Sequence, residues 1–244
     1  MIIMLTVNRT NVFGDMEILR NHFKGILNDL CENYMLADAF ADHCTPGGVR
    51  YDCDMLDQAA EERGYWFSNG ATRMIIGDED KEFIIKFQPY EDNRGHDYCK
   101  LELLAYKAAV QAGYDDLFCP IEYLFDYHFG DRICGVYVMP YCHCCEDTLE
   151  DESYKYQYKR FCSDNGYDEG DEDSRDEFDY DYDTDCSFIE LALHDWGRES
   201  EGEAFCDFLR DWGCNDLHAG NWGYFENKIV LVDYAGYGTR SCDF

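Results

Sequence analysis

The stretch "YWFSNGATRMIIGDEDKEFIIKF", Tyr65–Phe87, decides the fold class because its side-chain period differs from that of the residues around it. Aromatic, β-branched and other apolar side chains form two runs in it, and the polar turn "GDED" joins the runs. Two such runs around a polar turn are typical of an antiparallel hairpin. The stretch therefore predicts a β-rich region within this chain.

Helical periods flank the stretch on both sides. Residues 15–43 carry apolar side chains at spacings of three and four and predict a helix that Asp15 is placed to cap. Residues 54–63 predict a second helix, with Gly64 at the position of a C-terminal cap. After the hairpin, residues 97–112 return to the helical period. The hairpin is thus expected between helices.

The rest of the chain alternates between the two periods. Residues 119–141 predict two more strands around the turn "FGDR". Residues 188–193 and 204–209 predict two helical pieces, and the later stretch "KIVLVDY" predicts a strand. The whole pattern predicts an α+β fold with a small antiparallel β portion.

The composition limits the classes of partner. The 244 residues include 52 Asp or Glu against 20 Lys or Arg, a formal net charge of −32. This balance argues against nucleic acid backbones and anionic membranes as partners, and it favours basic partners, metal ions or simple solubility. Aromatic side chains make up 16% of the chain, which excludes full disorder, because disordered acidic chains are poor in aromatics.

Fourteen cysteines raise the question of compartment and metal binding. The N-terminal residues resemble neither a signal peptide nor a membrane span, so we expect a cytoplasmic protein with reduced thiols. The densest cluster is "CHCC", Cys142–Cys145, which contains one C-x-x-C pair. A structural zinc site needs a second pair at definite spacing, so a zinc-binding module is the weakest interpretation.

The segment 146–186 differs from the rest of the chain in charge. It holds 17 Asp or Glu against four Lys or Arg, and its later part has almost no aliphatic side chain. We expect a solvated insertion loop. A second interpretation is an acidic surface that imitates nucleic acid or captures a basic partner.

Two stretches near the C-terminus carry candidate chemistry: "NDLHAGNWG", Asn215–Gly223, and "LVDYAG", Leu231–Gly236. Phosphoryl transfer needs a cation for the phosphates, oxygen ligands for Mg²⁺ and a carboxylate that orients the acceptor hydroxyl. The chain offers a candidate for each part. The candidates are Lys86 in "FIIKF", Glu102 on the next predicted helix, and Asp216, Asn221 and Asp233 in the two C-terminal stretches.

These motifs together resemble the protein kinase-like superfamily, which includes aminoglycoside and choline phosphotransferases. "DLHAGN" resembles its catalytic loop, and "VDYAG" is similar to its D-F-G metal motif. "FIIKF" resembles the V-A-I-K strand, "CKLELLAYKAA" the helix with the paired Glu, and "GVYVMPY" the last strand and hinge beside the adenine. The resemblance covers about residues 65–238.

The resemblance implies a two-lobed protein kinase-like fold and a division into three parts. Residues 1–64 would be an added N-terminal helical element, and residues 65–141 a small antiparallel β lobe. Residues 142–244 would form a reduced helical lobe that contains the acidic insertion 146–186.

The resemblance also implies a role for each candidate residue. Lys86 would hold the α- and β-phosphates of ATP and take part in catalysis, and Glu102 would orient Lys86. Asp216 would be the catalytic base. Asn221 and Asp233 would bind Mg²⁺.

Further residues would contact the nucleotide. The stretch "FSNGATRMII" stands in place of the Gly-rich phosphate loop, with Asn69, Gly70, Ala71, Thr72 and Arg73 at the turn, and Met139 would lie near the adenine. His218 stands where small-molecule phosphotransferases have a histidine, which favours a small-molecule acceptor.

The chain also departs from the family pattern. Cys214 and Asn215 replace the residues that usually precede the catalytic Asp, and the phosphate loop has one Gly where protein kinases have several. Eleven residues follow Asp233, which predicts a lobe without a full activation segment.

Two functions therefore remain open from the sequence. The first is an ATP- and Mg²⁺-dependent phosphotransferase that passes the γ-phosphoryl group to a hydroxyl acceptor. The alternative is a catalytically weak or inactive kinase-like protein that captures a basic partner or mimics nucleic acid.

Overall fold

Two compact units divide the chain. The first consists of Met1–Leu103 and Pro120–Tyr141, and the second of Leu104–Cys119 and Cys142–Phe244. The expected division at residues 64 and 141 stays a prediction. The computed structural model describes residues 12–32, 36–39, 51–69, 73–78, 82–88, 96–143, 146–168, 170, 175, 177–178 and 184–234.

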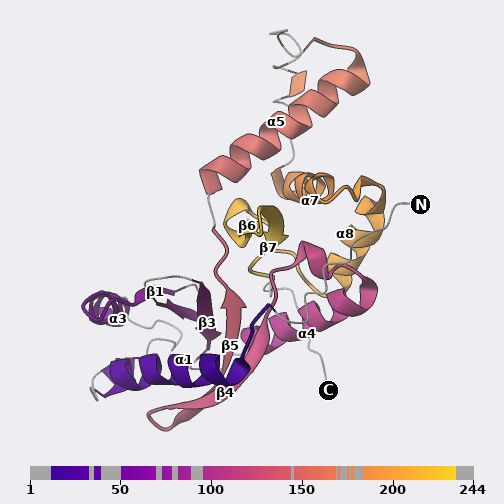
Figure 1. Ribbon diagram of the computed structural model, residues 1–244. Coiled ribbons are helices and arrows are strands. Elements are labelled where there is room, and N and C mark those ends of the chain that lie inside the picture. The colour runs from indigo at the N-terminus through magenta and orange to yellow at the C-terminus, as the bar shows by residue number, and fades with distance from the viewer. Residues whose placement is uncertain are drawn as a thin grey trace. The chain divides into compact units, whose positions relative to one another are not determined.

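An antiparallel sheet of five strands forms the centre of the first unit, in the order β1-β2-β3-β5-β4 (Figure 1). The predicted hairpin around "GDED" is confirmed, because β2 pairs with β3 in the register Ile76↔Ile85. The first predicted run is divided into two strands, β1 and β2, which pair with each other. The strands are β1 Trp66–Asn69, β2 Met74–Gly77, β3 Phe83–Phe87, β4 Glu122–Phe129 and β5 Arg132–Pro140.

The first helix, α1 (Met16–Cys31), begins where the sequence predicts and ends earlier. The carboxylate of Asp15 accepts the backbone N–H of Glu17 at 2.9 Å and so caps the helix. Of the predicted helix 15–43, residues 36–39 are again helical, and 40–43 lie outside the described residues. Arg20 donates to the carbonyl of Leu124 at 2.9 Å and ties α1 to β4.

A second helix, α3 (Tyr51–Glu61), is followed by Gly64, the residue that the sequence predicts as its C-terminal cap. Gly64 has a φ of +75°, a backbone conformation that side chains with a Cβ rarely adopt. Its N–H donates to Glu61, and the N–H of Tyr65 donates to Ala60, which completes a Schellman cap. The cap turns the chain directly into β1.

One apolar cluster joins α1, α3 and the sheet into the core of the first unit. Its fully buried members include Leu27 on α1, Leu56 on α3, and Ile85 and Val136 on neighbouring strands. Burial of such side chains contributes about 1.5–3 kcal/mol each. The helical residues before Tyr65 therefore share a core with the sheet.

The second unit is mainly helical. Its helix α7 (Thr184–Asp195) and helix α8 (Gly202–Asp211) match the two predicted helical pieces. The helix α4 (Tyr98–Ala112), also predicted, begins in the first unit and ends in the second. Short 3-10 turns described in this unit are η2 Asp115–Leu117, η3 Glu199–Glu201 and η4 Ala219–Asn221.

A two-stranded hairpin lies in the same unit. Its second strand, β7 (Lys228–Leu231), is the predicted "KIVLVDY" strand, and β6 (Trp222–Phe225) is one that we did not predict. The turn between them places Glu226 and Asn227 at φ values of 52° and 61°, the geometry of a tight two-residue hairpin turn. The strand β6 begins at Trp222, directly after the candidate catalytic loop.

The expectation of a solvated loop over 146–186 is wrong for its first half. Residues Glu146–Asn165 form the helix α5. Aromatic side chains take the place of the missing aliphatic ones, because Tyr158 and Phe178 form a small buried cluster with Cys162. Residues 169, 171–174, 176 and 179–183 of the segment lie outside the described residues.

Among the residues that the structure describes, we find no helix both long enough and apolar enough to cross a membrane.

Candidate functional site

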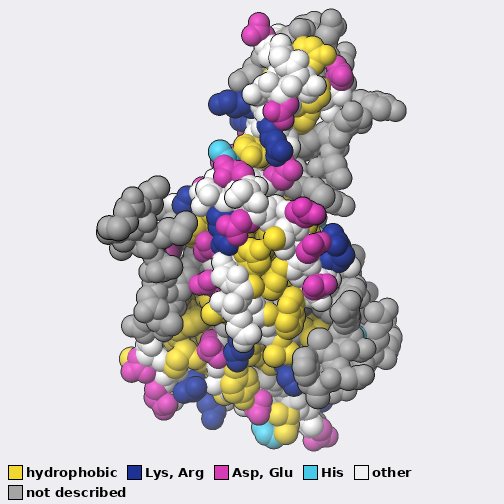
Figure 2. All heavy atoms as spheres, turned by 90° about the vertical axis from the view of Figure 1, so that its right-hand side faces the viewer, with side chains coloured by type: hydrophobic (Ala, Val, Ile, Leu, Met, Phe, Trp, Pro, Cys, Tyr) yellow, Lys and Arg dark blue, Asp and Glu magenta, His cyan; other side chains and the backbone are white. Residues whose placement is uncertain are grey.

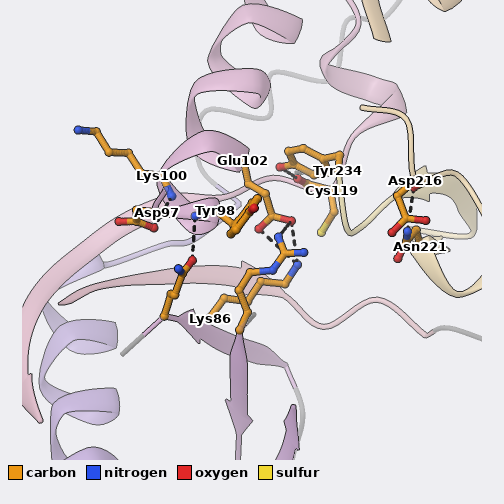
Figure 3. A network of polar contacts seen from close by, with 11 residues as sticks. Lys86, Asp97, Tyr98, Lys100, Glu102, Cys119, Asp216, Asn221 and Tyr234 are labelled. Carbon is orange, nitrogen blue, oxygen red and sulfur yellow. Dashed lines mark hydrogen bonds and ion pairs between the residues drawn. The ribbon is translucent and has the colours of Figure 1, made fainter. Parts of the chain in front are cut away.

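Lys86 lies on β3 in the first unit, opposite Ile75 on β2 and Tyr137 on β5. Its side chain is 5% exposed, and its Nζ donates to the two carboxylate oxygens of Glu102 at 3.3 and 3.5 Å. Glu102 belongs to α4 and is fully buried. The contact between these two residues is present as expected, and its role toward phosphates stays a prediction (Figure 3).

A third charged residue joins this pair. The guanidinium of Arg73 lies 2.8 Å from Oε1 of Glu102, closer than the ammonium of Lys86, and its side chain is 10% exposed. The resemblance places Arg73 at the turn of the phosphate loop and does not place it beside Glu102. Arg73 directly precedes β2 and stands two residues before Ile75. Ile75 lies opposite Lys86 in the pairing of β2 with β3. The sequence alone does not reveal this register, and so it could not predict that Arg73 lies near the Lys86–Glu102 pair.

One buried carboxylate thus pairs with two buried cations. Removing charges from water is costly, and close pairing recovers only part of that cost. Nearby groups respond to the same environment: burial raises the pKa of the Cys99 thiol well above its usual value, and the Glu102 carboxylate raises it further. Cys99 is therefore a neutral, buried thiol beside the charged cluster.

Polar contacts at the start of α4 fix this helix against β3. Gln88, directly after β3, accepts the N–H of Tyr98 at 2.9 Å and donates to the carbonyl of His96 at 2.9 Å. Asp97 caps the helix by accepting the N–H of Lys100 at 3.0 Å. These bonds hold the first turn of the helix that carries Glu102.

The Asp97 carboxyl has a raised pKa, because its burial outweighs the hydrogen bonds that it accepts. Its hydrogen-bond donors include the backbone N–H of Lys100 and the hydroxyl of Tyr137, the second at 3.4 Å. The charged form of Asp97 is therefore held at a cost in free energy.

The second unit holds the C-terminal candidates. The side-chain amide of Asn221, in η4, donates to the carbonyl oxygen of Asp216 at 2.8 Å. The carbonyl oxygen of Asn221 accepts the N–H of Val232 at 2.8 Å and that of Asp233 at 3.3 Å. Asn221 is buried and fastens the loop 216–221 to the residues after β7. The structure therefore brings Asn221 and Asp233 side by side.

Asp216 is the more exposed of these residues, with 46% of its side chain accessible. The Nε2 atom of His218 lies 3.6 Å from its carboxylate. Nδ1 of His218 accepts the N–H of Gly220 at 3.1 Å, so the proton of the neutral ring lies on Nε2, which faces Asp216. Buried Cys214 precedes the loop, and its N–H donates to Leu209 at the end of α8.

A second anchor follows Asp233. The hydroxyl of Tyr234 donates to the carbonyl of Cys119 at 3.0 Å, and its ring is buried against Phe118. The N–H of Cys119 donates to Leu231 at 2.8 Å. Asp233 therefore lies between two fixed points, one at Asn221 and one at Tyr234.

The donor atoms of this loop suit a hard cation. The amide nitrogen of Asn221 is occupied by Asp216, which leaves the amide oxygen as the atom that can ligate a metal. With the Asp233 carboxylate it makes a pair of oxygen donors, and Mg²⁺ commonly takes one or two protein oxygens besides phosphate and water. Within the described ranges, no three His, Cys, Asp or Glu side chains gather into a metal site.

The remaining sequence candidates divide into two groups. Gly70, Ala71 and Thr72 lie outside the described residues. Met139 is buried within β5, where it pairs with Ile84, and its contact with adenine stays a prediction. From the cluster "CHCC", Cys142 is buried with its Sγ 3.0 Å from that of Cys119.

Comparisons of the chain with profiles of known protein families, with curated proteins and with solved structures find no match.

Proposed function

We propose that this protein is an ATP- and Mg²⁺-dependent phosphotransferase with a kinase-like arrangement of two lobes. The observation that carries the proposal is the buried ion pair between Lys86 on a central strand and Glu102 on the following helix. A lysine is seldom buried to this extent in a sheet without a partner and a task. The proposal accounts for both.

The proposed division of labour follows the local geometry. Lys86 binds the phosphates of the nucleotide, and Glu102 keeps its ammonium in one place. In the other unit, Asn221 and Asp233 would hold Mg²⁺ through their side-chain oxygens. The metal would neutralise the charge that develops on the transferred phosphoryl group.

Asp216 is the proposed partner of the acceptor hydroxyl. Its half-exposed carboxylate can be reached by an acceptor, and it would orient the hydroxyl and receive its proton. The Nε2 atom of His218 lies 3.6 Å from this carboxylate. The fixed position of Asn221 keeps the Asp216 backbone in place.

A nucleotide-dependent shift in thermal unfolding tests the proposal. ATP with Mg²⁺ should stabilise the full chain by about 2.7 kcal/mol at a hundred times the dissociation constant. Lys86→Met should lose this increment, whereas Lys100→Met, an exposed lysine on α4, should keep it. An unchanged transition in wild-type protein with ATP and Mg²⁺ would overturn the proposal.

Catalysis needs a separate measurement. Labelled ATP should transfer its γ-phosphoryl group to the protein itself or to an added hydroxyl compound. Asp216→Asn should abolish the transfer and leave the nucleotide shift in place. Binding without transfer to any of a panel of small-molecule and protein acceptors would favour the second candidate.

The second candidate is an acidic binding protein with a kinase-like fold. Five of the first seven residues of α5 are exposed Asp or Glu: Glu146, Asp147, Glu150, Asp151 and Glu152. Elsewhere on the visible face, Asp and Glu side chains are mixed with Lys and Arg rather than gathered in one patch (Figure 2). This favours a local basic partner over an extended mimic of nucleic acid.

Charge-neutral replacements test that candidate. Substituting Asn or Gln at the five positions should remove binding to a polylysine probe if α5 is the capture surface. Binding that persists would exclude α5. Deletion of residues 164–185 then reports whether the later part of the acidic segment contributes.

A further inference from the structure

The buried charged cluster of the first unit contains one more cation than a lysine–glutamate pair. Arg73 and Lys86 both pair with one carboxylate oxygen of Glu102, Oε1, at 2.8 and 3.3 Å. Their side chains are 10%, 5% and 0% exposed. These three groups together carry one net positive charge in a region from which water is largely excluded.

The position of Arg73 connects the cluster to the expected phosphate loop. Arg73 directly precedes β2 and directly follows residues 70–72, which the resemblance places at the phosphates. A Gly-rich loop holds phosphates with backbone N–H groups that can approach closely. This loop has a single Gly, so fewer such approaches are possible.

The two cations, Arg73 and Lys86, differ in how their side chains can bind phosphate. A guanidinium is a planar group with five N–H donors that matches phosphate oxygens in pairs, whereas an ammonium acts as a compact point charge. Both cations lie at ion-pair distance from Oε1 of Glu102, 2.8 Å for Arg73 and 3.3 Å for Lys86, so one carboxylate holds both of them in place.

We infer that Arg73 is a second phosphate-binding residue, which with Lys86 forms a two-cation site for a nucleoside polyphosphate. This inference rests on the proposed nucleotide binding and adds the residue that takes over from the missing glycines. Arg73 supplies charge and hydrogen-bond donors at the base of the loop, and Glu102 keeps both cations aligned. The site therefore selects ligands by their number of phosphates.

Dissociation constants for ATP, ADP and AMP, measured by calorimetry on the full chain, test the inference. Arg73→Met should weaken ATP and ADP binding by about tenfold or more, the size of one lost hydrogen bond to a charged group, and should weaken AMP binding much less. Arg73→Lys should recover part of the ATP affinity. The control is Arg132→Met, at the far end of the β4–β5 hairpin from Lys86, which should leave all three constants unchanged.

A residue that only supports Glu102 would give a different pattern. In that case Arg73→Met would weaken ATP and AMP by the same factor, and the inference would be wrong while nucleotide binding stood. If wild-type protein bound none of the three nucleotides, the proposed function itself would fail and this inference with it. Circular dichroism establishes that Arg73→Met is folded; if it is not, Arg73→Lys decides by its ratio of ATP to AMP affinity.

Discussion

The N–H of Asp233 donates to the carbonyl oxygen of Asn221 at 3.3 Å, although the two residues are separated by a complete β-hairpin. The neighbouring N–H of Val232 donates to the same oxygen at 2.8 Å. A buried asparagine therefore fixes both ends of the hairpin at one point. The backbones of Asn221 and Asp233 are therefore already held together before any ligand binds.

Replacing Asn221 by Ala should loosen the loop 216–221. The variant loses the hydrogen bond from the side-chain amide to Asp216, and we expect a loss of about 1 kcal/mol in the free energy of unfolding. Urea denaturation without ligand measures this loss. The control is Asn165→Ala on α5, which also loses a hydrogen bond from an asparagine amide to a backbone carbonyl. Asn227, in the turn of the same hairpin, is not used because its φ is positive.

A second substitution at this position, Asn221→Asp, separates the structural role of Asn221 from metal binding. Asn221→Asp keeps an oxygen donor but removes the N–H donor to Asp216. It should therefore lose stability in the absence of metal and still respond to Mg²⁺ with ATP. Equal stability of Asn221→Asp and wild type would contradict the role of this hydrogen bond.

Removing the charge of Glu102 should destabilise the first unit. Glu102→Gln leaves Arg73 and Lys86 buried beside a neutral amide, and we expect a loss of about 3 kcal/mol, the scale for breaking a buried pair. Glu61→Gln, an exposed residue at the end of α3, should change stability by less than about 0.5 kcal/mol. Chemical denaturation of both variants checks the prediction, and similar midpoints would contradict it.

Asp97→Asn should stabilise the protein at neutral pH. Burial raises the pKa of the Asp97 carboxyl above its ordinary value of 3.8, so the native state binds this proton more tightly than the unfolded chain. The resulting stability is present below the ordinary value and is lost as the pH rises through the raised one. Asparagine caps a helix as well as aspartate does and carries no charge to bury.

The pH dependence distinguishes this effect from a simple change in packing. The advantage of Asp97→Asn over wild type should be present at pH 7, should shrink as the pH falls through the raised pKa of Asp97 toward 3.8, and should not change further below that value. Asp15→Asn, the exposed cap of α1, should show no such gain at pH 7. A constant difference at all pH values would exclude the titration of Asp97 as its cause.

The thiols of Cys119 and Cys142 should form a disulfide under mild oxidation. Their sulfur atoms lie 3.0 Å apart in the second unit. With a small-molecule disulfide as oxidant, the two thiols become one disulfide and the oxidant is reduced to two thiols. Peptide mapping by mass spectrometry should find the two cysteines linked, with a loss of two hydrogens.

Cysteine variants control for other reactions. Cys142→Ser should prevent the link, and Cys162, buried in the α5 cluster, should stay a thiol. If oxidation modified only the half-buried Cys31 and Cys206, the expected pairing would be wrong.

Helix ends were predictable from the sequence where a few neighbouring residues determine them. The cap at Asp15 and the glycine at Gly64 depend on a few neighbouring residues, and both were predicted correctly. Predictions failed where the apolar signal came from aromatic side chains. The strand "WGYF" and the helix α5 have few aliphatic residues, and their Tyr, Phe and Trp rings supply the buried surface instead.

The sequence by itself determined the succession of helices and antiparallel strands, because side-chain period, caps and turn residues act over a few positions. It also placed Lys86, Glu102, Asp216, Asn221 and Asp233 on the elements that carry them. Only the tertiary structure decided that Arg73 shares Glu102 with Lys86, and that Asn221 joins Asp233 through its backbone. Those contacts depend on strand register and on how a helix packs on a sheet. Interactions between residues far apart in the chain determine both.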